Sequence, residues 1–152
     1  MPKYELIPHT ADMGIRVTGK DLPETFQKAG FALFDIMTDI KEVNPAVKET
    51  VKVTADNLDE LMNYWLTSLL QQFTLKNRLI SKVKINNISP PLAPPKASLA
   101  FGGETALEAV IQGEPYNPSR HQIHKEIKAI TFHNLSVRKT SNGWQAEVIF
   151  DV

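Results

Sequence analysis

The last two residues of the sequence bring two negative groups together. Asp151 is followed by Val152, the final residue, so a side-chain carboxylate stands next to the α-carboxylate. Two carboxylates held close together either repel each other or share a cation. A solvated chain end without a role is the simpler interpretation. The residues alone leave both interpretations open.

Another acidic residue with potential chemistry lies near the opposite end of the chain. In His9-Thr10-Ala11-Asp12 a histidine and an aspartate are three residues apart in a short turn, so both could face one point. An aspartate that hydrogen-bonds its own turn is the commoner use of such a residue. The remaining histidines, His121, His124 and His133, offer no helical His-x-x-x-His pair, which disfavours a zinc site.

The sequence lacks the motifs of several enzyme classes. It has no cysteine, which excludes a thiolate nucleophile, a disulfide and a Cys-type zinc site. It also has no Gly-x-Ser-x-Gly motif, no glycine-rich phosphate loop and no dinucleotide-binding fingerprint. We therefore expect no catalysis by this chain alone and no nucleotide site of its own.

Composition and charge are those of an ordinary globular domain. The 152 residues are 42% hydrophobic and 22% charged, which fits one domain, residues 1–152, with a sizeable core. The 17 basic and 17 acidic residues leave no net charge, which disfavours tight binding to nucleic acid by general attraction. No apolar run approaches the length of a membrane span and no signal segment is recognisable, so we expect a cytoplasmic protein without membrane contact.

Two amphipathic helices are predicted in the first half of the chain. A capping candidate followed by proline predicts a helix over residues 23–38. Asn57 and Glu60 have the spacing of a capping interaction and predict a second helix, whose wide apolar stripe runs to Phe73. That stripe contains Trp65 and could line a ligand pocket, but core packing is far commoner at this spacing. We place no site there.

Alternating apolar and polar residues predict strands in the rest of the chain. The final stretch, Trp144 to Val152, keeps a period of two throughout, so we expect it to be held in a sheet. Ser141-Asn142-Gly143 predicts a hairpin turn before it, and Gly102-Gly103 predicts another. The other predicted strands are Tyr4–Ile7, Ile15–Thr18, Val47–Ala55, Leu79–Ile88, Ala97–Phe101, Glu104–Gln112, His124–His133 and Leu135–Lys139.

The segment from Ser89 to Lys96 is rich in proline, which can neither continue a helix nor donate to a sheet ladder. We predict a stiff loop inserted at a sheet edge there, not a domain linker. Strands dominate the second half, whereas both helices lie in the first. The predicted class is therefore α+β: a single two-layer domain in which two helices pack on a mixed, mostly antiparallel β-sheet.

Several segments taken together resemble the archease family. Each segment is unspecific alone, but their order is specific jointly and covers nearly the whole chain. Ile130 and Phe132 stand where valine and tyrosine are common in that family, and the proline-rich loop is longer than its pattern requires. The matching segments are His9-Thr10-Ala11-Asp12 with Gly14-Ile15, Leu61 to Leu66, Gly113-Glu114, Lys128 to His133, and Trp144 with Phe150-Asp151-Val152.

The resemblance implies a non-catalytic activator of the RtcB-type RNA-splicing ligase, which joins tRNA exons with GTP and a divalent metal. Such an activator promotes guanylylation of the ligase and its multiple turnover, and it meets tRNA indirectly, through the ligase. Carried over by position, the family's metal ligands are Asp12, Asp151 and Val152, with His9 as a residue that could support Asp12. Oxygen ligands suit a hard divalent ion, namely calcium, magnesium or manganese.

Two alternatives stay open. The chain could be a metal-dependent hydrolase or nuclease that acts by itself with Asp12, Asp151 and His9. It could instead be a chaperone-like interaction module in which the terminal acids are structural.

The basic residues Arg120, Lys125 and Lys128 could face a docking partner or RNA, although solvated charge is the commoner role of such residues.

Overall fold

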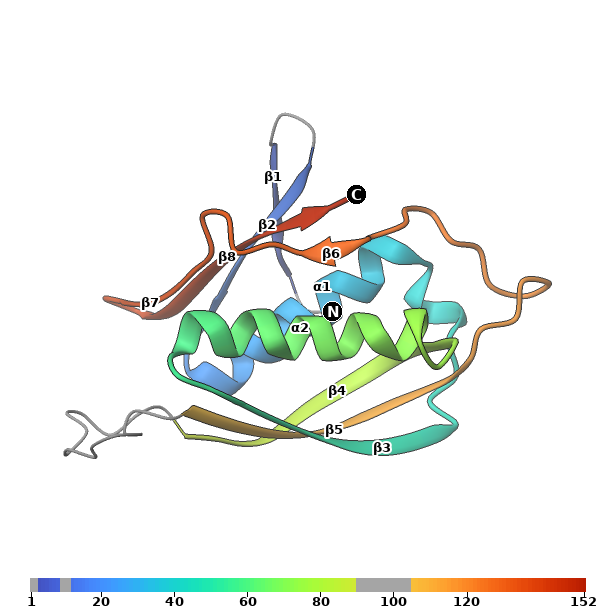
Figure 1. Ribbon diagram of the computed structural model, residues 1–152, viewed down its shortest axis with the longest axis horizontal. Helices are drawn as coiled ribbons and strands as arrows, with labels where there is room; N and C mark the ends of the chain where they lie inside the picture. The colour runs from blue at the N-terminus through green and yellow to red at the C-terminus, as the bar shows by residue number, and fades with distance from the viewer. Residues whose placement is uncertain (1–2, 9–11, 90–104) are drawn as a thin grey trace.

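The computed structural model describes residues 3–8, 12–89 and 105–152. Within these residues two helices, one short 3-10 helix (η1) and eight strands follow one another along the chain (Figure 1). Their bounds are β1 Glu5–Pro8, β2 Met13–Gly19, α1 Leu22–Met37, η1 Ile40–Glu42, β3 Val47–Ala55, α2 Leu58–Thr74, β4 Arg78–Ser89, β5 Thr105–Pro115, β6 Ala129–Ile130, β7 Ser136–Thr140 and β8 Gly143–Asp151.

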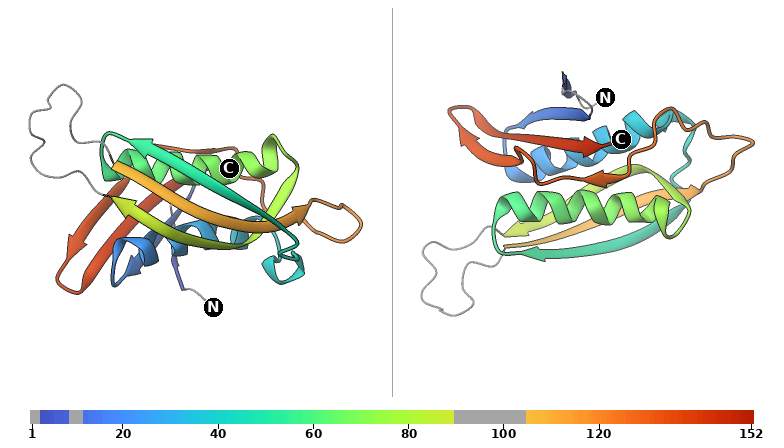
Figure 2. Two further views of the ribbon diagram at one scale, coloured as in Figure 1. Left: turned by 90° about the horizontal axis from the view of Figure 1, so that it is seen from below. Right: turned by 45° about the horizontal axis from the view of Figure 1, so that its top comes forward.

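The described strands form two sheets with the helices between them. One sheet has the order β1-β2-β8-β6, with β7 also paired to β8, and the other has the order β3-β5-β4. Each pairing in both sheets is antiparallel. α1 packs against β2 and β8 on one side and β4 on the other, and α2 packs between β6 and β7 on one side and β3 to β5 on the other (Figure 1, Figure 2).

The predicted α+β class, with two helices on antiparallel strands, is confirmed, but the layering differs from our expectation. In place of one mixed sheet in a two-layer domain, the described strands make two sheets and the helices form a middle layer. The cause lies in α1, where Ala32 and Phe34 lie on either side of the stripe that contains Phe26 and Leu33. All four side chains are buried. A helix that is apolar over so wide an arc needs cover on more than one side.

Both helices begin at the predicted capping residues. The Asp21 carboxylate accepts a hydrogen bond from the Glu24 backbone N–H at 2.9 Å. The Asn57 side chain accepts one from the Glu60 N–H, also at 2.9 Å. Each cap satisfies a backbone donor that the first helical turn leaves without a partner. The two helix starts are therefore fixed by local sequence.

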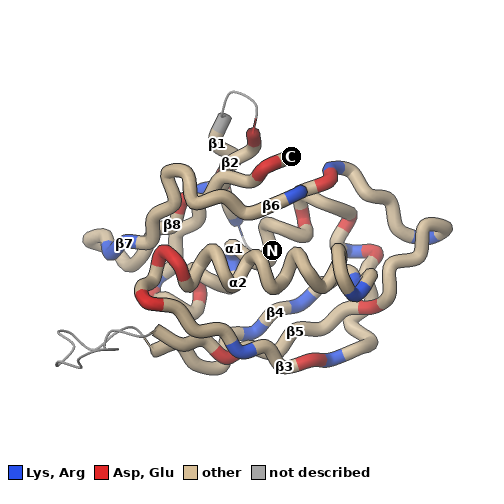
Figure 3. Tube along the Cα trace, viewed as in Figure 1, with Lys and Arg blue, Asp and Glu red and all other residues tan. Residues whose placement is uncertain are grey.

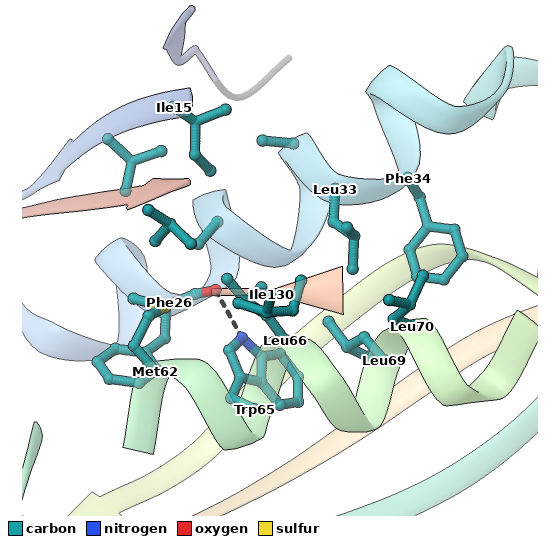
Figure 4. Close-up of a cluster of buried hydrophobic side chains, with 14 of the residues drawn as sticks. Ile15, Phe26, Leu33, Phe34, Met62, Trp65, Leu66, Leu69, Leu70 and Ile130 are labelled. Atoms are coloured by element: carbon teal, nitrogen blue, oxygen red, sulfur yellow. Dashed lines mark hydrogen bonds between the residues drawn. The ribbon is translucent and has the colours of Figure 1, made fainter. Parts of the chain in front are cut away.

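Trp65 lies at the centre of the core, between the two helices. Its ring is fully buried, and its indole N–H donates to the Phe26 carbonyl at 2.9 Å (Figure 4). The surrounding side chains include Leu33, Leu66 and Leu69, which come from both helices. A buried tryptophan with its single donor satisfied is a packing residue. The prediction that this stripe packs in the core is confirmed.

The predicted strand from His124 to His133 is wrong over most of its length. Only Ala129–Ile130 forms a strand, β6. The chain before it crosses the end of α1, where the His124 N–H donates to the Met37 carbonyl at 2.7 Å. It reaches the edge of β8 only at Lys128. Alternating residue types cannot reveal this, because they say nothing about which edge a segment meets.

The predicted strand Ala97–Phe101, the Gly102-Gly103 turn and most of the proline-rich loop lie outside the described residues. The strands on either side of them, β4 and β5, pair directly with each other. The Ser141-Asn142-Gly143 hairpin is confirmed, since Thr140 pairs with Gly143 at the end of the β7–β8 ladder. No helix in the described part of the chain combines the length and apolar character that crossing a membrane requires.

Candidate metal site at the end of the β2–β8 ladder

The ladder between β2 and β8 ends beside two acidic residues. Its last pair is Met13 with Phe150, and Asp12 precedes Met13 as Asp151 follows Phe150. Side chains alternate across a strand, so Asp151 lies on the face opposite the buried Phe150. Acidic positions at the start of β2 and at the end of β8 are visible near the C-terminus in Figure 3. Residues from near the two ends of the sequence thus lie at the same end of the ladder.

The other edge of β8 is held by β6. Ala129 pairs with Asp151, and the Lys128 backbone N–H donates to the Asp151 carbonyl at 2.7 Å. The next residue, Val152, is half-buried and packs against the core. The expectation that the final stretch is tied into a sheet is confirmed. The backbone at Asp151 and Val152 is therefore held in place beside β6.

Asn63 on α2 is a buried polar residue that the sequence analysis did not single out. Its side-chain N–H₂ group donates to the Ile130 carbonyl at 3.1 Å and to the Thr131 carbonyl at 3.3 Å. Its side-chain oxygen accepts from the Thr67 hydroxyl at 3.1 Å. Asn63 therefore positions β6, which in turn pairs with Asp151. The sequence signal that could have revealed Asn63 is an amide side chain within an otherwise apolar helix. A buried amide must find hydrogen-bond partners.

The structure places three of the four sequence-predicted site residues. Asp12 and Asp151 flank the Met13–Phe150 pair and Val152 follows, whereas His9 lies outside the described residues. In the part of the chain that the structure describes, no three His, Asp or Glu side chains form a metal-binding group. The predicted ligand set contains only two such side chains, because its third member is an α-carboxylate. An all-oxygen set suits a hard divalent cation better than zinc.

The family model named Archease protein family matches residues 4–152. The chain belongs to the archease family. The protein archease of Methanosarcina acetivorans is 33% identical over 150 residues, covering 99% of this chain and 96% of that protein. The protein archease of Sulfurisphaera tokodaii is 31% identical over 152 residues and covers 100% of both chains.

Solved structures share the fold of this archease. The solution structure of protein 1598 from Methanobacterium thermoautotrophicum has a TM-score of 0.75 and 28% identity, with 98% of both chains covered. A crystal structure from Thermotoga maritima, described as an archease and possible chaperone, has a TM-score of 0.54 and covers 96% of this chain and 94% of that chain. At 15% identity the second match shows the fold alone.

A polar cluster in this archease joins the end of β5 to the turn that follows it. Glu114 accepts a hydrogen bond from the Asn44 backbone N–H at 2.8 Å, lies 2.8 Å from Nε2 of the buried His121, and pairs with Arg120. The Asn117 N–H donates to Nδ1 of His121 at 2.9 Å. Burial opposes the ionised form of Glu114, but the hydrogen bonds from Asn44, His121 and Arg120 lower its pKa. With both nitrogens engaged, His121 has a structural role.

Two aromatic side chains are exposed beside β6. Phe132, which follows the β6 segment, is 58% exposed, and Tyr64 on α2 is 41% exposed. Their rings meet edge to face with centroids 6.4 Å apart. Tyr64 is the chain neighbour of Asn63, so the pair borders the segment that holds β8. Exposed aromatic rings are the residue type that protein interfaces use as anchors.

Proposed function

We propose that this archease is a metal-binding accessory protein that activates the RtcB-type RNA-splicing ligase and promotes its GTP-dependent guanylylation and multiple turnover in tRNA splicing. Membership of the archease family supports an accessory role. The observation that carries the proposal is that Asp12 and Asp151 each lie one residue beyond the last pair of the β2–β8 ladder, at the same end. No catalytic residue is assigned to this chain.

The register of β2 and β8 supports a cation shared by the two aspartates. Continuing the Met13–Phe150 pair by one residue sets Asp12 across from Asp151. Directly opposite residues in an antiparallel pair have Cβ atoms about 4.5–5.5 Å apart. Their carboxylates and the α-carboxylate of Val152 would hold a calcium, magnesium or manganese ion. Such an ion supplies the positive charge that lets neighbouring carboxylates stay ionised.

The Tyr64–Phe132 pair supports a protein contact beside this site. Both rings are exposed, both border β6, and β6 pairs with the strand that carries Asp151. A partner that covers the two rings contacts the β6 segment, which pairs with the strand that carries Asp151. We place the contact with the ligase here.

The test of the proposed function is the activation of the purified ligase. Guanylylation and multiple turnover are measured with wild-type archease and with the variants Asp12→Ala and Asp151→Ala. Both variants should lose stimulation, because each removes a carboxylate from the site. Glu126→Ala, which removes an exposed carboxylate from the segment before β6, should stimulate normally. Full stimulation by both aspartate variants would rule out the proposed site.

Substitutions at Phe132 separate docking from metal binding. Phe132→Ala removes the ring and should weaken association with the ligase, measured by co-sedimentation of the two proteins. It should leave the stabilisation of archease by added metal unchanged. Phe132→Tyr keeps the ring and should keep the association. Equal binding by the alanine and tyrosine variants would contradict a docking role for this pair.

Incubation of archease with metal and RNA, without ligase, tests the alternative of an autonomous hydrolase or nuclease. We expect no turnover, because the site lacks an assigned general acid or base. Turnover that Asp12→Ala abolishes would favour that alternative over the accessory role. The same substitution thus distinguishes the two functions through different assays.

A further inference from the structure

The three-stranded sheet turns one face away from the helices, and this face is rich in lysine. Along β3, exposed residues alternate with half-buried ones that face the helices, and β4 exposes Lys82 and Lys84 in the same way. Figure 2 (left) shows this sheet in front of the helices, with no described element lying over it. The outward residues of β3 and β4 include Lys48, Thr50, Lys52, Thr54, Lys82, Lys84 and Asn87. We call this surface the lysine face.

The strand register arranges the lysines around β5. Lys48 and Lys82 both pair with Gln112, from its two sides, and Lys84 pairs with Val110. Neighbouring strands are about 4.8 Å apart, so the backbones at Lys48 and Lys82 are separated by roughly 10 Å. Lys82 and Lys84 are about 7 Å apart along β4. Three charges thus lie within roughly 10 Å of one another on one surface, with Lys52 further along β3.

The lysine face carries an excess of positive charge although the chain is neutral. Glu108 on β5 is the acidic residue beside the lysines, across from Lys52. Glu114, on the same alternation at the end of β5, is paired with Arg120. No ion pair among the described residues involves Lys48, Lys82 or Lys84. Figure 3 shows stretches of blue on β3 and β4. A zero net charge therefore conceals a local basic surface.

The outward side of the opposite sheet has only a small excess of negative charge. This side carries three acidic residues, Glu5, Glu147 and Asp151, and two basic ones, Arg16, which pairs with the two glutamates, and Arg138. The helix layer separates this side from the lysine face. The excess of positive charge on the lysine face thus has no counterpart on the other side. An anion approaching from solution is therefore attracted mainly to the lysine face.

The chemistry of the lysine face suits a phosphate backbone better than a protein. Lysine is depleted at protein interfaces, where arginine and aromatic residues are enriched, and the described outward positions of this sheet contain neither. Lysine binds phosphate as a point charge, and the hydroxyls of Thr50 and Thr54 and the amides of Gln112 and Asn87 add hydrogen-bond donors. Without aromatic rings the face cannot stack bases. Recognition is then independent of sequence.

We propose that the lysine face binds the sugar-phosphate backbone of RNA directly. This goes beyond the contact through the ligase that the family resemblance implies. The choice of RNA over DNA rests on the proposed function, whereas the binding of a phosphate backbone rests on the sheet alone. The side with Asp12 and Asp151 stays turned away from the RNA.

The experiment measures fluorescence anisotropy of a short labelled single-stranded RNA with archease alone, in chelator and without ligase. Wild type should bind at low salt. The logarithm of the binding constant should fall against the logarithm of the salt concentration with a slope of about −3, because each of Lys48, Lys52, Lys82 and Lys84 neutralises a phosphate and releases about 0.7 counterions. The double variant Lys48→Gln/Lys82→Gln should bind about tenfold more weakly and have a slope smaller by about 1.4.

The matched control is Lys20→Gln/Lys139→Gln, which removes the same charge from exposed positions outside the lysine face. It should bind like wild type, and both double variants should keep the thermal midpoint of wild type. Equal weakening by the two double variants, or no binding by wild type, would overturn the proposal. Because ligase and metal are absent, such a failure leaves the proposed activation of the ligase untouched.

Two further arms identify the ligand. A DNA oligonucleotide of the same sequence should bind with a similar salt slope, since the contact is to the backbone. Binding to phosphatidylserine vesicles in place of RNA would overturn the proposal in favour of a membrane surface. If wild type does not bind RNA and the Lys48→Gln/Lys82→Gln variant loses association with the ligase, the lysine face is a protein-docking surface. That result would equally overturn the proposal.

Discussion

Asp12 and Asp151 flank the same end of the β2–β8 ladder, each one residue beyond the Met13–Phe150 pair. More than a hundred residues separate them in sequence, and the antiparallel register removes that separation. Neither aspartate belongs to a continuous motif with the other. Their meeting depends on β2 and β8 being direct neighbours in the sheet.

Asp151→Asn should have opposite effects with and without metal. Excess calcium, magnesium or manganese should raise the thermal midpoint of wild type by roughly 5–10 °C at 100 times Kd. The variant should lose most of this rise, because it lacks one charged ligand. In chelator it should be as stable as wild type or slightly more so, since a repulsion between like charges is relieved. Glu126→Gln, the control, should behave as wild type in both conditions.

Extending the chain by two residues after Val152 tests the α-carboxylate. The extension moves that carboxylate while every side chain stays in place, so the metal-induced rise in thermal midpoint should fall. Val152→Ala is the control, because it keeps the carboxylate at its position and loses only packing against the core. An undiminished metal response in the extended chain would remove Val152 from the site but leave Asp151 in it.

The fold was predictable where local chemistry decides it. The caps at Asp21 and Asn57 and the alternation in β3 and β8 all specify their elements without help from the rest of the chain. The layering was not predictable in this way, because the division of strands into two sheets depends on which edges meet. The segment before Ala129 shows the same limit, since its contact with α1 replaces strand pairing.

The sequence predicted the residues of the candidate site but not how they are arranged in space. Sequence spacing singled out Asp12 beside His9 and the pair of carboxylates at Asp151 and Val152, and the family resemblance joined the three into one ligand set. The structure supplies the neighbour relation that joins them. The sequence did not reveal the role of Asn63, because this role depends on the Ile130 carbonyl of β6, which lies 67 residues away in sequence.

Asn63→Ala should destabilise the protein and loosen β6. The substitution leaves the buried Ile130 carbonyl without its side-chain donor, at a cost of about 1–3 kcal/mol in the free energy of unfolding. Chemical denaturation measures this loss, and hydrogen exchange of the Lys128 amide, which donates to Asp151, should become faster. Gln71→Ala, on the exposed side of α2, is the control and should change neither quantity. Unchanged exchange at Lys128 would show that Asn63 does not hold β6.

Glu114→Gln should lower stability in a manner that depends on pH. Hydrogen bonds from Asn44, His121 and Arg120 favour the ionised carboxylate and lower its pKa from the ordinary 4.5 despite burial. Because the folded-state pKa lies below the unfolded one, the contribution of Glu114 is complete above pH 4.5 and is lost as pH falls through the folded value. At neutral pH the variant should therefore be less stable than wild type by about 1–3 kcal/mol.

The difference in free energy of unfolding between wild type and Glu114→Gln should shrink as the pH falls below 4.5. Glu114 of the wild type then becomes protonated and resembles glutamine. Denaturant titrations of both proteins across this range measure it, and taking the difference cancels the other carboxylates. Glu126→Gln, which changes an exposed carboxylate that belongs to none of the ion pairs of the described residues, is the control and should show little difference at any pH. A Glu114→Gln difference that stays constant down to strongly acidic pH would mean that the charge of Glu114 does not stabilise the cluster.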